Sequence, residues 1–480
     1  MNKIVGEGLT FDDVLLVPRL SNIVSRSQVN LTTYLTREIK LNIPILSASM
    51  DTVTESKMAI AIAREGGLGV IHRFMPIDRQ VEEVAKVKRA ENVIIEDPIT
   101  IRPESKVKEA KRLMEKWGIS GLLVVDDHKR LLGIVSRRDV LFENDGKEVR
   151  EVMTPRAKLI VAEKKIGLEE AKDMFRKYKI EKIPIVDNDD RLIGLITARD
   201  VVNRTMNPRA LKDSKGRLMV GAAIGVRGDY LERAKKLWKA GVDVIFIDVA
   251  HGHSTLVIDA IKKVKAELKE APVIAGNVAT SEGVEDLVKA GADGVKVGVG
   301  PGSVCTTRVV TGAGIPQLTA IMECAKAGRK LDVPIIADGG IRKSGDLVKA
   351  LAAGASSVMI GNLLAGTDES PGPLIFRNGK RYKIYRGMAS FYAMLGKEMQ
   401  ERYEVEDLID MSYKAEGVEA YVPYRGSVRE VLEQLISGLR SGMSYCGASN
   451  IKELQEKALF IKITHAAYLE GLPHDVEGLT

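Results

Sequence analysis

Cys305 is the residue whose type and surroundings most directly suggest chemistry. It lies in a loop rich in glycine and small polar residues, Gly300-Pro301-Gly302-Ser303-Val304-Cys305-Thr306-Thr307-Arg308. A thiolate is strongly nucleophilic and also leaves readily, so it suits attack on an electron-poor ring carbon followed by release. A lone cysteine is more often a small buried apolar residue, and Cys324 and Cys446 have such ordinary surroundings. The loop favours a catalytic thiol at Cys305.

Polar or glycine-rich residues also follow several short apolar runs of the sequence. They are Asp248 with His251-Gly252-His253, Gly276-Asn277, Gly298 to Arg308, Asp338-Gly339-Gly340, and Gly361-Asn362. Glycine lets backbone N–H groups approach phosphate oxygens closely, although a single Gly-Gly pair is more often a simple turn. Two such segments after the last two runs favour a phosphate-binding site.

His251 and His253 raise the question of a metal site because they are two residues apart. A catalytic zinc site needs a third protein ligand, and no further histidine or carboxylate has a spacing that would complete one. A role in a ligand-binding loop is the simpler interpretation.

Eight apolar runs alternate with helical stretches and would position these residues. Continuous apolar runs indicate strands buried on both faces, and eight of them alternating with helices predict a (β/α)8 TIM barrel. A doubly wound sheet is the main alternative, but no GxGxxG follows the first run. The eight runs are 43–47, 68–72, 219–224, 244–248, 272–277, 294–298, 334–338 and 357–361.

A repeat interrupts this pattern after the second run. Residues 107–142 and 168–203 each predict a helix, a strand, a turn, a strand and a final Arg-Asp-Val, and Gly194 follows Gly133 by 61 residues. The two copies resemble a tandem pair of cystathionine-β-synthase-type (CBS) modules, a family that often binds adenine or guanine nucleotides; a purely structural role is the alternative. We expect barrel segments at 1–90 and 206–480, with the CBS pair at 91–205 (about 93–148 and 151–205).

Length, composition and charge limit the class of protein. The 480 residues are 45% hydrophobic and 29% charged, which is typical of a soluble globular protein of two or three domains. We expect a cytoplasmic location, because no apolar run approaches the roughly 18 residues of a membrane span and the N-terminus lacks a targeting pattern. The net charge of +7 is spread along the chain, so neither a membrane nor a nucleic acid is an expected partner.

Several long motifs together resemble the IMP dehydrogenase / GMP reductase family. The resemblance covers essentially the whole chain, including the CBS pair. Besides the Cys305 loop, the matching motifs are Leu9-Thr10-Phe11-Asp12-Asp13-Val14, Ser49-Met50-Asp51-Thr52-Val53-Thr54-Glu55, Asp338-Gly339-Gly340-Ile341-Arg342 and Tyr385-Arg386-Gly387-Met388.

The family contains two activities, and the segment after Met388 discriminates between them. The dehydrogenases carry a mobile active-site flap with an Arg-Tyr pair, and this chain has Arg402-Tyr403 within the expected flap at about 388–416, followed by Glu416-Gly417-Val418-Glu419. The resemblance therefore implies an NAD-dependent oxidoreductase that converts inosine-5′-monophosphate (IMP) to xanthosine-5′-monophosphate (XMP), the committed step of guanine nucleotide synthesis. The alternatives are GMP reductase activity with NADPH, and a CBS-based nucleotide-sensing regulator with a silent barrel.

The resemblance also implies a mechanism and the residues that perform it. Cys305 would add to C2 of IMP, a hydride would pass to NAD, and water would cleave the resulting thioimidate. The family assigns water activation to the arginine that matches Arg402, helped by Thr307, with Tyr403 beside it. An arginine base is chemically unusual, because a guanidinium normally stays protonated.

Ligand positions follow from the same resemblance. IMP would contact Ser303, Asp338, Gly339, Gly340, Gly361, Asn362, Tyr385, Arg386, Gly387, Met388, Ala389 and Glu416. NAD would contact Asp248, Val249, Ala250, Asn277, Gly298, Val299 and Gly300. A potassium ion would bind carbonyls of Gly300, Gly302 and Cys305, together with Glu470, Gly471 and Leu472 of a neighbouring subunit, which implies a homotetramer. Ala389 departs from the glycine usual in the family.

Overall fold

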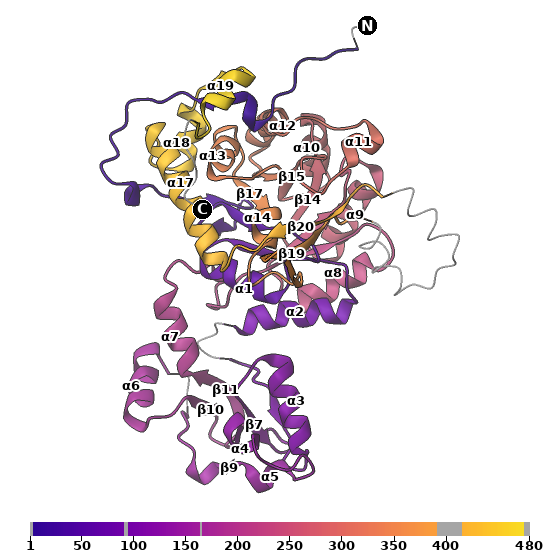
Figure 1. Cartoon of the computed structure of the whole chain (residues 1–480). Coiled ribbons are helices and arrows are strands. Elements are labelled where there is room, and N and C mark those ends of the chain that lie inside the picture. The colour runs from indigo at the N-terminus through magenta and orange to yellow at the C-terminus, as the bar shows by residue number, and fades with distance from the viewer. Residues whose placement is uncertain (1–2, 91–94, 164–165, 391–414, 475–480) are drawn as a thin grey trace. The chain divides into compact units, whose positions relative to one another are not determined.

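A computed structural model describes residues 3–90, 95–163, 166–390 and 415–474 of the chain (Figure 1). The chain divides into two compact units. Unit 1 comprises Met1–Val87, Arg209–Leu211 and Met219–Thr480, and unit 2 comprises Lys88–Pro208 and Lys212–Leu218. In the described residues, no helix is both long enough and apolar enough to span a membrane.

Unit 1 is built on a closed barrel of eight parallel strands. All residues of β4 (Ile45–Ser47), β5 (Leu68–Ile71), β12 (Gly221–Ile224), β15 (Gly294–Val297) and β17 (Ser357–Ile360) are buried. Apart from Lys296 in β15 they are apolar or small, as expected of strands covered on both faces. The predicted TIM barrel is confirmed, and the doubly wound alternative is wrong. In spatial order the strands are β12 (Gly221–Ile224), β13 (Val244–Asp248), β14 (Val273–Val278), β15 (Gly294–Val297), β16 (Ile335–Asp338), β17 (Ser357–Ile360), β4 (Ile45–Ser47) and β5 (Leu68–Ile71).

Amphipathic helices follow the strands along the chain. In α17 (Val428–Tyr445) the buried residues Val428, Leu432, Leu435 and Leu439 recur at helical spacing, so one face of this helix packs against the barrel. The other long helices of the barrel are α1 (Ser56–Arg64), α2 (Ile77–Arg89), α8 (Tyr230–Lys239), α9 (Thr255–Glu267), α10 (Ser281–Lys289), α12 (Gln317–Leu331) and α13 (Ser344–Ala352).

Unit 1 also contains shorter elements outside the eight barrel strands and their helices. The strands β18 (Leu374–Arg377), β19 (Lys380–Arg386) and β20 (Glu419–Pro423) form an antiparallel sheet, which pairs Tyr385 with Ala420. Most of the expected flap, including Arg402 and Tyr403, lies outside the described residues. Further short elements are η1 (Phe11–Asp13), β1 (Val14–Leu16), η2 (Arg26–Gln28), β2 (Thr33–Tyr34), β3 (Lys40–Leu41), α11 (Thr307–Thr311), α14 (Asn362–Ala365), α18 (Ile451–Lys457), β21 (Phe460–Lys462) and α19 (His465–Glu470).

Unit 2 contains the two copies of the repeat. The first is α3 (Val107–Trp117), β7 (Gly121–Val125), β8 (Leu131–Ser136) and α4 (Arg137–Val140). The second is α6 (Leu168–Tyr178), β10 (Lys182–Val186), β11 (Leu192–Thr197) and α7 (Ala198–Met206). Each element of the second copy begins 61 residues after its counterpart, and both strand pairs are antiparallel hairpins. The remaining elements of the unit are β6 (Thr100–Ile101), α5 (Val149–Val152), β9 (Thr154–Pro155) and η3 (Arg156–Lys158).

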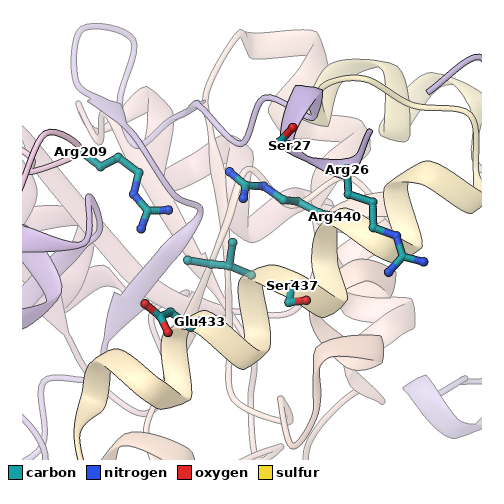
Figure 2. A pocket seen from close by; sticks show the side chains of 7 residues that line it. Arg26, Ser27, Arg209, Glu433, Ser437 and Arg440 are labelled. Atoms are coloured by element: carbon teal, nitrogen blue, oxygen red, sulfur yellow. The ribbon is translucent and has the colours of Figure 1, made fainter. Parts of the chain in front are cut away.

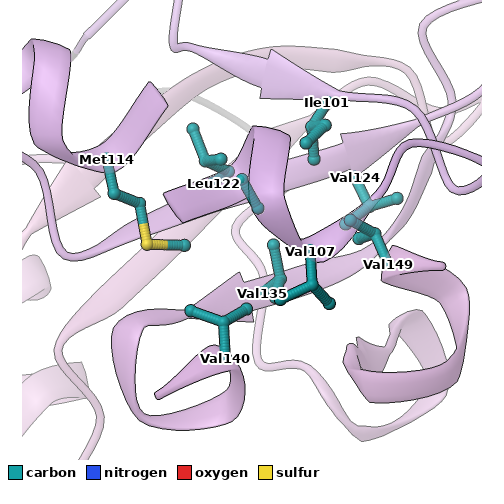
Figure 3. Packing of buried hydrophobic residues seen from close by; sticks show 9 residues of the cluster. Ile101, Val107, Met114, Leu122, Val124, Val135, Val140 and Val149 are labelled. Carbon is teal, nitrogen blue, oxygen red and sulfur yellow. The ribbon is translucent and has the colours of Figure 1, made fainter. Parts of the chain in front are cut away.

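Apolar clusters hold each copy together and join the two. Figure 3 shows the first cluster, in which Val107 and Met114 of α3 pack with Leu122, Val124 and Val135 of the β7–β8 hairpin. The second copy has an equivalent cluster. A third cluster contains residues of both hairpins, so the copies are packed against each other; its buried members are Leu123, Leu131, Val186 and Leu195.

Candidate active site

The polar residues that follow the apolar runs gather at one end of the barrel. Asp248 and Asp338 are the last residues of β13 and β16, and Asn277 lies near the end of β14. All neighbouring barrel strands are parallel, so their carboxyl ends meet at the same rim, where TIM-barrel enzymes build their sites. The Cys305 loop follows β15 and therefore reaches the same rim.

A buried lysine joins the residues expected on the IMP side to those expected on the NAD side. Nζ of Lys296 on β15 lies 2.8 Å from Oδ1 of Asp248 and 2.5 Å from Oδ2 of Asp338. Nδ2 of Asn277 donates to the same Asp338 oxygen at 2.9 Å, and Ser49 donates to Asp248. Sequence reasoning missed Lys296, although a lysine inside a buried apolar run was a usable signal.

Charge balance keeps this cluster ionised. Burial opposes the charge of Asp248, but the Lys296 ammonium and the hydrogen bonds from Lys296 and Ser49 outweigh it, so the pKa of Asp248 is below its ordinary value. Burial likewise opposes the charge of Lys296, but Asp248 and Asp338 raise its pKa above the usual value. The cluster therefore presents carboxylates with fixed positions at the rim.

The turn after β15 requires glycine. Gly298 has φ +144°, and a Cβ at this position would lie 2.2 Å from the carbonyl oxygen of Asp338. Gln317, also missed in the sequence, donates from Nε2 to the carbonyls of Val297 and Asp338, each at 3.0 Å. Arg308 Nε donates to the Val299 carbonyl at 2.9 Å. These contacts fix the start and the end of the Cys305 loop.

The thiol belongs to a chain of hydrogen bonds. Sγ of Cys305 lies 3.2 Å from Oγ1 of Thr307, and Oγ1 of Thr307 donates to Oε2 of Glu416 at 2.7 Å. Glu416 was expected on the IMP side. Its carboxylate lies one hydroxyl away from the thiol, so it can exchange a proton with the sulfur through Thr307.

Backbone hydrogen bonds tie the Glu416 segment to the Cys305 loop. The N–H of Thr306 donates to the Glu416 carbonyl at 2.9 Å, and the N–H of Val418 donates to the Val304 carbonyl at 2.9 Å. Two segments that lie more than a hundred residues apart in the sequence are thereby held together, with the Glu416 carboxylate beside the thiol loop.

Glycine-rich turns and a tyrosine surround the expected phosphate position. Gly339 and Gly340 have φ +88° and +82°, which glycine adopts without strain. Asn362 Nδ2 donates to Ser303 Oγ at 3.1 Å and so connects the turn after β17 to the Cys305 loop. Burial raises the pKa of Tyr385, with the nearby Asp338 and Cys305 acting in the same direction, so its hydroxyl stays protonated beside Gly361.

The residues after Tyr385 have interaction partners within the chain, so they are not free for a ligand alone. The Arg386 guanidinium forms an ion pair with Asp51, with Nε 2.7 Å from Oδ2. The Gly387 N–H donates to Val418 at 3.1 Å, which leaves that group less free for phosphate than expected. Met388 lies beside Asp51, whose N–H is 3.4 Å from Sδ. Ala389 is not among the described non-glycine residues with positive φ, so its methyl group causes no backbone strain.

The turn after β13 packs against the end of β14. The Val249 N–H donates to Gly276 at 3.1 Å, the Asn277 N–H donates to Val249 at 2.9 Å, and exposed Ala250 follows. His253 Nε2 lies 2.9 Å from Oδ2 of Asp286 on α10, which gives this histidine a structural partner. The residues expected to contact NAD therefore come together at one side of the rim.

The residues expected to bind potassium lie in two places. The Cys305 N–H donates to the Gly302 carbonyl at 3.1 Å, so the loop turns tightly between these two residues, both of which are expected to bind the ion. Glu470, Gly471 and Leu472 lie at the end of α19, and α19 packs against η1 of the same chain.

Comparisons with known proteins agree with one another. The family model described as the IMP dehydrogenase / GMP reductase domain matches residues 8–474. The chain is 56% identical over 480 residues to the inosine-5′-monophosphate dehydrogenase of Aquifex aeolicus, covering 99% of this chain and 97% of the relative. It is 54% identical over 473 residues to that of Nitrosopumilus maritimus, covering 98% of each.

Solved structures give a similar result. A variant of the GMP reductase from Trypanosoma brucei in complex with guanosine 5′-monophosphate has a TM-score of 0.91 and 45% identity, covering 98% of this chain and 99% of that one. The same enzyme in complex with guanosine 5′-triphosphate has a TM-score of 0.80 and 41% identity, covering 96% and 98%. The matching loops, the barrel and these full-length similarities lead to one conclusion: the chain belongs to the IMP dehydrogenase / GMP reductase family.

Proposed function

We propose that this chain oxidises IMP to XMP with NAD and water, the committed step of guanine nucleotide synthesis. The full-length identity to named IMP dehydrogenases supports the direction of the reaction. The observation in the structure that carries the chemistry is the hydrogen-bonded chain from Cys305 through Thr307 to Glu416, beside the glycine-rich turns.

The reaction has two covalent stages. The Cys305 thiolate forms a bond to C2 of IMP, and the hydrogen at C2 leaves with its electron pair, so the purine is oxidised and a thioimidate remains. NAD, when bound, supplies the hydride acceptor. Water then adds to C2 and loses a proton, and the S–C2 bond breaks to give XMP and the free thiolate.

The described residues suit these stages. Ser303, Gly340, Gly361 and Asn362 would hold the phosphate, and Asp338 would hold the ribose hydroxyls. Asp248 would bind the nicotinamide riboside, with Asn277 and Gly298 nearby. Because Lys296 contacts both carboxylates, it would fix the spacing of the two ligands at the rim.

Glu416 would accept a proton through Thr307 during the covalent cycle. We expect Glu416→Gln to lower kcat about 10²-fold and to weaken its rise with pH, because an amide cannot take the proton that the Thr307 hydroxyl passes on. Steady-state rates between pH 6 and pH 9 would measure this effect. An unchanged pH profile in a folded Glu416→Gln enzyme would exclude the relay.

Arg402 is the other candidate for water activation, and it lies outside the described residues. We expect Arg402→Ala to slow hydrolysis and to leave the covalent adduct as the main species in steady state. Intact-mass measurement after mixing with IMP and NAD would detect it. Normal XMP release by this variant would contradict the assignment.

GMP reductase activity is the second candidate, because the two solved structures described above are of a GMP reductase. Parallel assays at 340 nm would separate the two activities: IMP with NAD should increase absorbance, and GMP with NADPH should leave it unchanged. A decrease with GMP and NADPH, without turnover of IMP, would assign the reductase.

The monovalent cation and the homotetramer are parts of the same proposal. Carbonyls of Gly300, Gly302 and Cys305, with Glu470, Gly471 and Leu472 of a neighbouring subunit, would hold potassium, and the ion would stabilise the loop that carries the thiol. The same assay with and without potassium tests this part.

Unit 2 is proposed to be a tandem CBS pair that binds adenine or guanine nucleotides. The 61-residue repeat of helix, hairpin and helix supports it, as does the GTP complex of the similar reductase. Its proposed bounds are 91–205, between the proposed barrel segments 1–90 and 206–480. If the chain were only a nucleotide-sensing regulator, the barrel would show no turnover and Cys305→Ala would change nothing.

A further inference from the structure

A group of arginine side chains lines a cavity in unit 1, and none of its residues has been given a role above. A cavity of about 300 Å³ lies between η2, α17 and the segment at Arg209. Figure 2 shows the side chains that line it. Three arginines, two serines, Glu433 and Ile436 line it, and the arginines are Arg26, Arg209 and Arg440. This volume is roughly ten times the about 30 Å³ that a water molecule occupies in the liquid, so the cavity has room for a phosphate group.

Arg440 supplies the second observation. Its Nε is buried and has no hydrogen-bond partner among the described residues. In Figure 2 its guanidinium points toward that of Arg209. Burial lowers the pKa of Arg440, and the charge of Arg209 acts in the same direction. A buried donor without an acceptor is unfavourable, and a bound anion would remove this penalty.

The acidic side chains nearby do not balance the arginines. Glu433 lines the cavity but lies 3.2 Å from Arg429 Nε, and Glu65, outside the lining, lies 3.4 Å from Arg209 and 3.6 Å from Arg429. Among the described side chains, neither Arg26 nor Arg440 has a carboxylate within ion-pair distance. The cavity therefore carries excess positive charge with forked donors that suit phosphate oxygens.

We propose that the cavity formed by Arg26, Arg209 and Arg440 binds a phosphate group, either as inorganic phosphate or as the phosphate of a small ester. The site differs from the IMP phosphate site, because none of its residues lies on the loops after β15, β16 or β17. Phosphate binding in this cavity therefore does not require the reaction at Cys305.

The test uses the full chain, and the arginine variants distinguish binding in this cavity from binding at the substrate's phosphate position. Calorimetric titration with inorganic phosphate and, separately, ribose 5-phosphate should give saturable binding to the unmodified protein. Arg440→Gln should weaken it about tenfold or more, because one charge-assisted contact is lost. Arg26→Gln, at an exposed position, should weaken it without risk to the core.

Arg112→Gln is the matched control, because Arg112 is an exposed arginine on α3 of unit 2 and its loss changes the net charge equally. It should bind phosphate as the unmodified protein does. Tighter binding of ribose 5-phosphate than of inorganic phosphate would assign an ester, and the reverse order the free ion. Absent binding, or equal weakening in Arg112→Gln, would overturn the proposal.

Discussion

Cys305→Ala should reduce turnover of IMP and NAD by roughly 10⁴-fold or more, because the variant loses the sulfur that attacks C2 in the proposed reaction. The variant should still fold and bind IMP, since Cys305 lies in a partly exposed loop rather than in the core. Intact-mass measurement should find an adduct on the unmodified enzyme with IMP and NAD, and none on the variant.

Cys324→Ala is the matched control for this experiment. Burial raises the pKa of Cys324 to about 12, so this thiol stays protonated and unreactive near neutral pH. Its removal should lower stability modestly through a small cavity and leave the adduct and kcat unchanged. Substantial turnover by Cys305→Ala would remove the thiol from the mechanism, and a silent unmodified barrel would favour the regulator alternative.

The barrel could be predicted because the burial of its strands on both faces leaves a pattern in the sequence itself. Strands such as Leu68–Ile71 and Ser357–Ile360 are covered on both faces, so every position is apolar or small, and eight such runs point to one architecture. The β18–β19–β20 sheet was not predicted. Its strand β19 begins with exposed Lys380 and Arg381, so it lacks the apolar pattern that marks a core strand.

The repeat could be predicted for a different reason. Two copies that fold alike must keep the same turn and capping residues in register, as Asp139 and Asp200 do. In each copy this aspartate accepts a hydrogen bond at the start of a helix, from Ser136 and from Thr197. The ligand of the two copies could not be predicted from these matching positions, because helix-capping residues stabilise the fold and do not indicate what it binds.

The site was predicted in its parts but not in its contacts. Loop composition placed Cys305, Asp338 and Asn362 at the rim, because parallel strands end together. The contact of Thr307 with Glu416 joins residues 109 positions apart and depends on how β20 returns to the Cys305 loop, which no local pattern encodes. Lys296 was missed because periodicity identifies a buried position without identifying its partners.

Among the rim residues without a proposed ligand contact of their own, Lys296 should be the one whose replacement, Lys296→Met, is most damaging. It removes a buried cation from between Asp248 and Asp338, and breaking a buried ion pair in this way costs about 3–5 kcal/mol. The carboxylates would then lose their fixed spacing, and we expect kcat/KM for both IMP and NAD to fall about 10²-fold or more.

The pH dependence of stability gives a readout that a simple packing defect would not produce. In the unmodified protein the pKa of Asp248 is lowered and that of Lys296 is raised. Asp248 thus stabilises the fold above its unfolded pKa of about 3.9, and this contribution is lost as pH falls through the folded value. Lys296 stabilises the fold below its unfolded pKa of about 10.4, and this contribution is lost as pH rises through the folded value. The contribution of Asp248 and Lys296 to stability should therefore be nearly constant between about pH 5 and pH 9.

In Lys296→Met the pKa shift of Asp248 should change from lowered to raised, and the pH dependence of stability that it causes should reverse. Burial without the cation raises the pKa of this carboxyl, so the folded state holds a proton that the unfolded state has released, and the free energy of unfolding should fall as pH rises above about 4. Chemical denaturation at several pH values measures this slope. Lys265→Met removes a lysine paired with Asp293 at 2.8 Å on the outside of the barrel and should leave both the slope and KM unchanged. Lys296→Arg should restore most of the flat profile, because it keeps the charge; a flat profile in Lys296→Met would mean that the lysine does not hold Asp248 ionised.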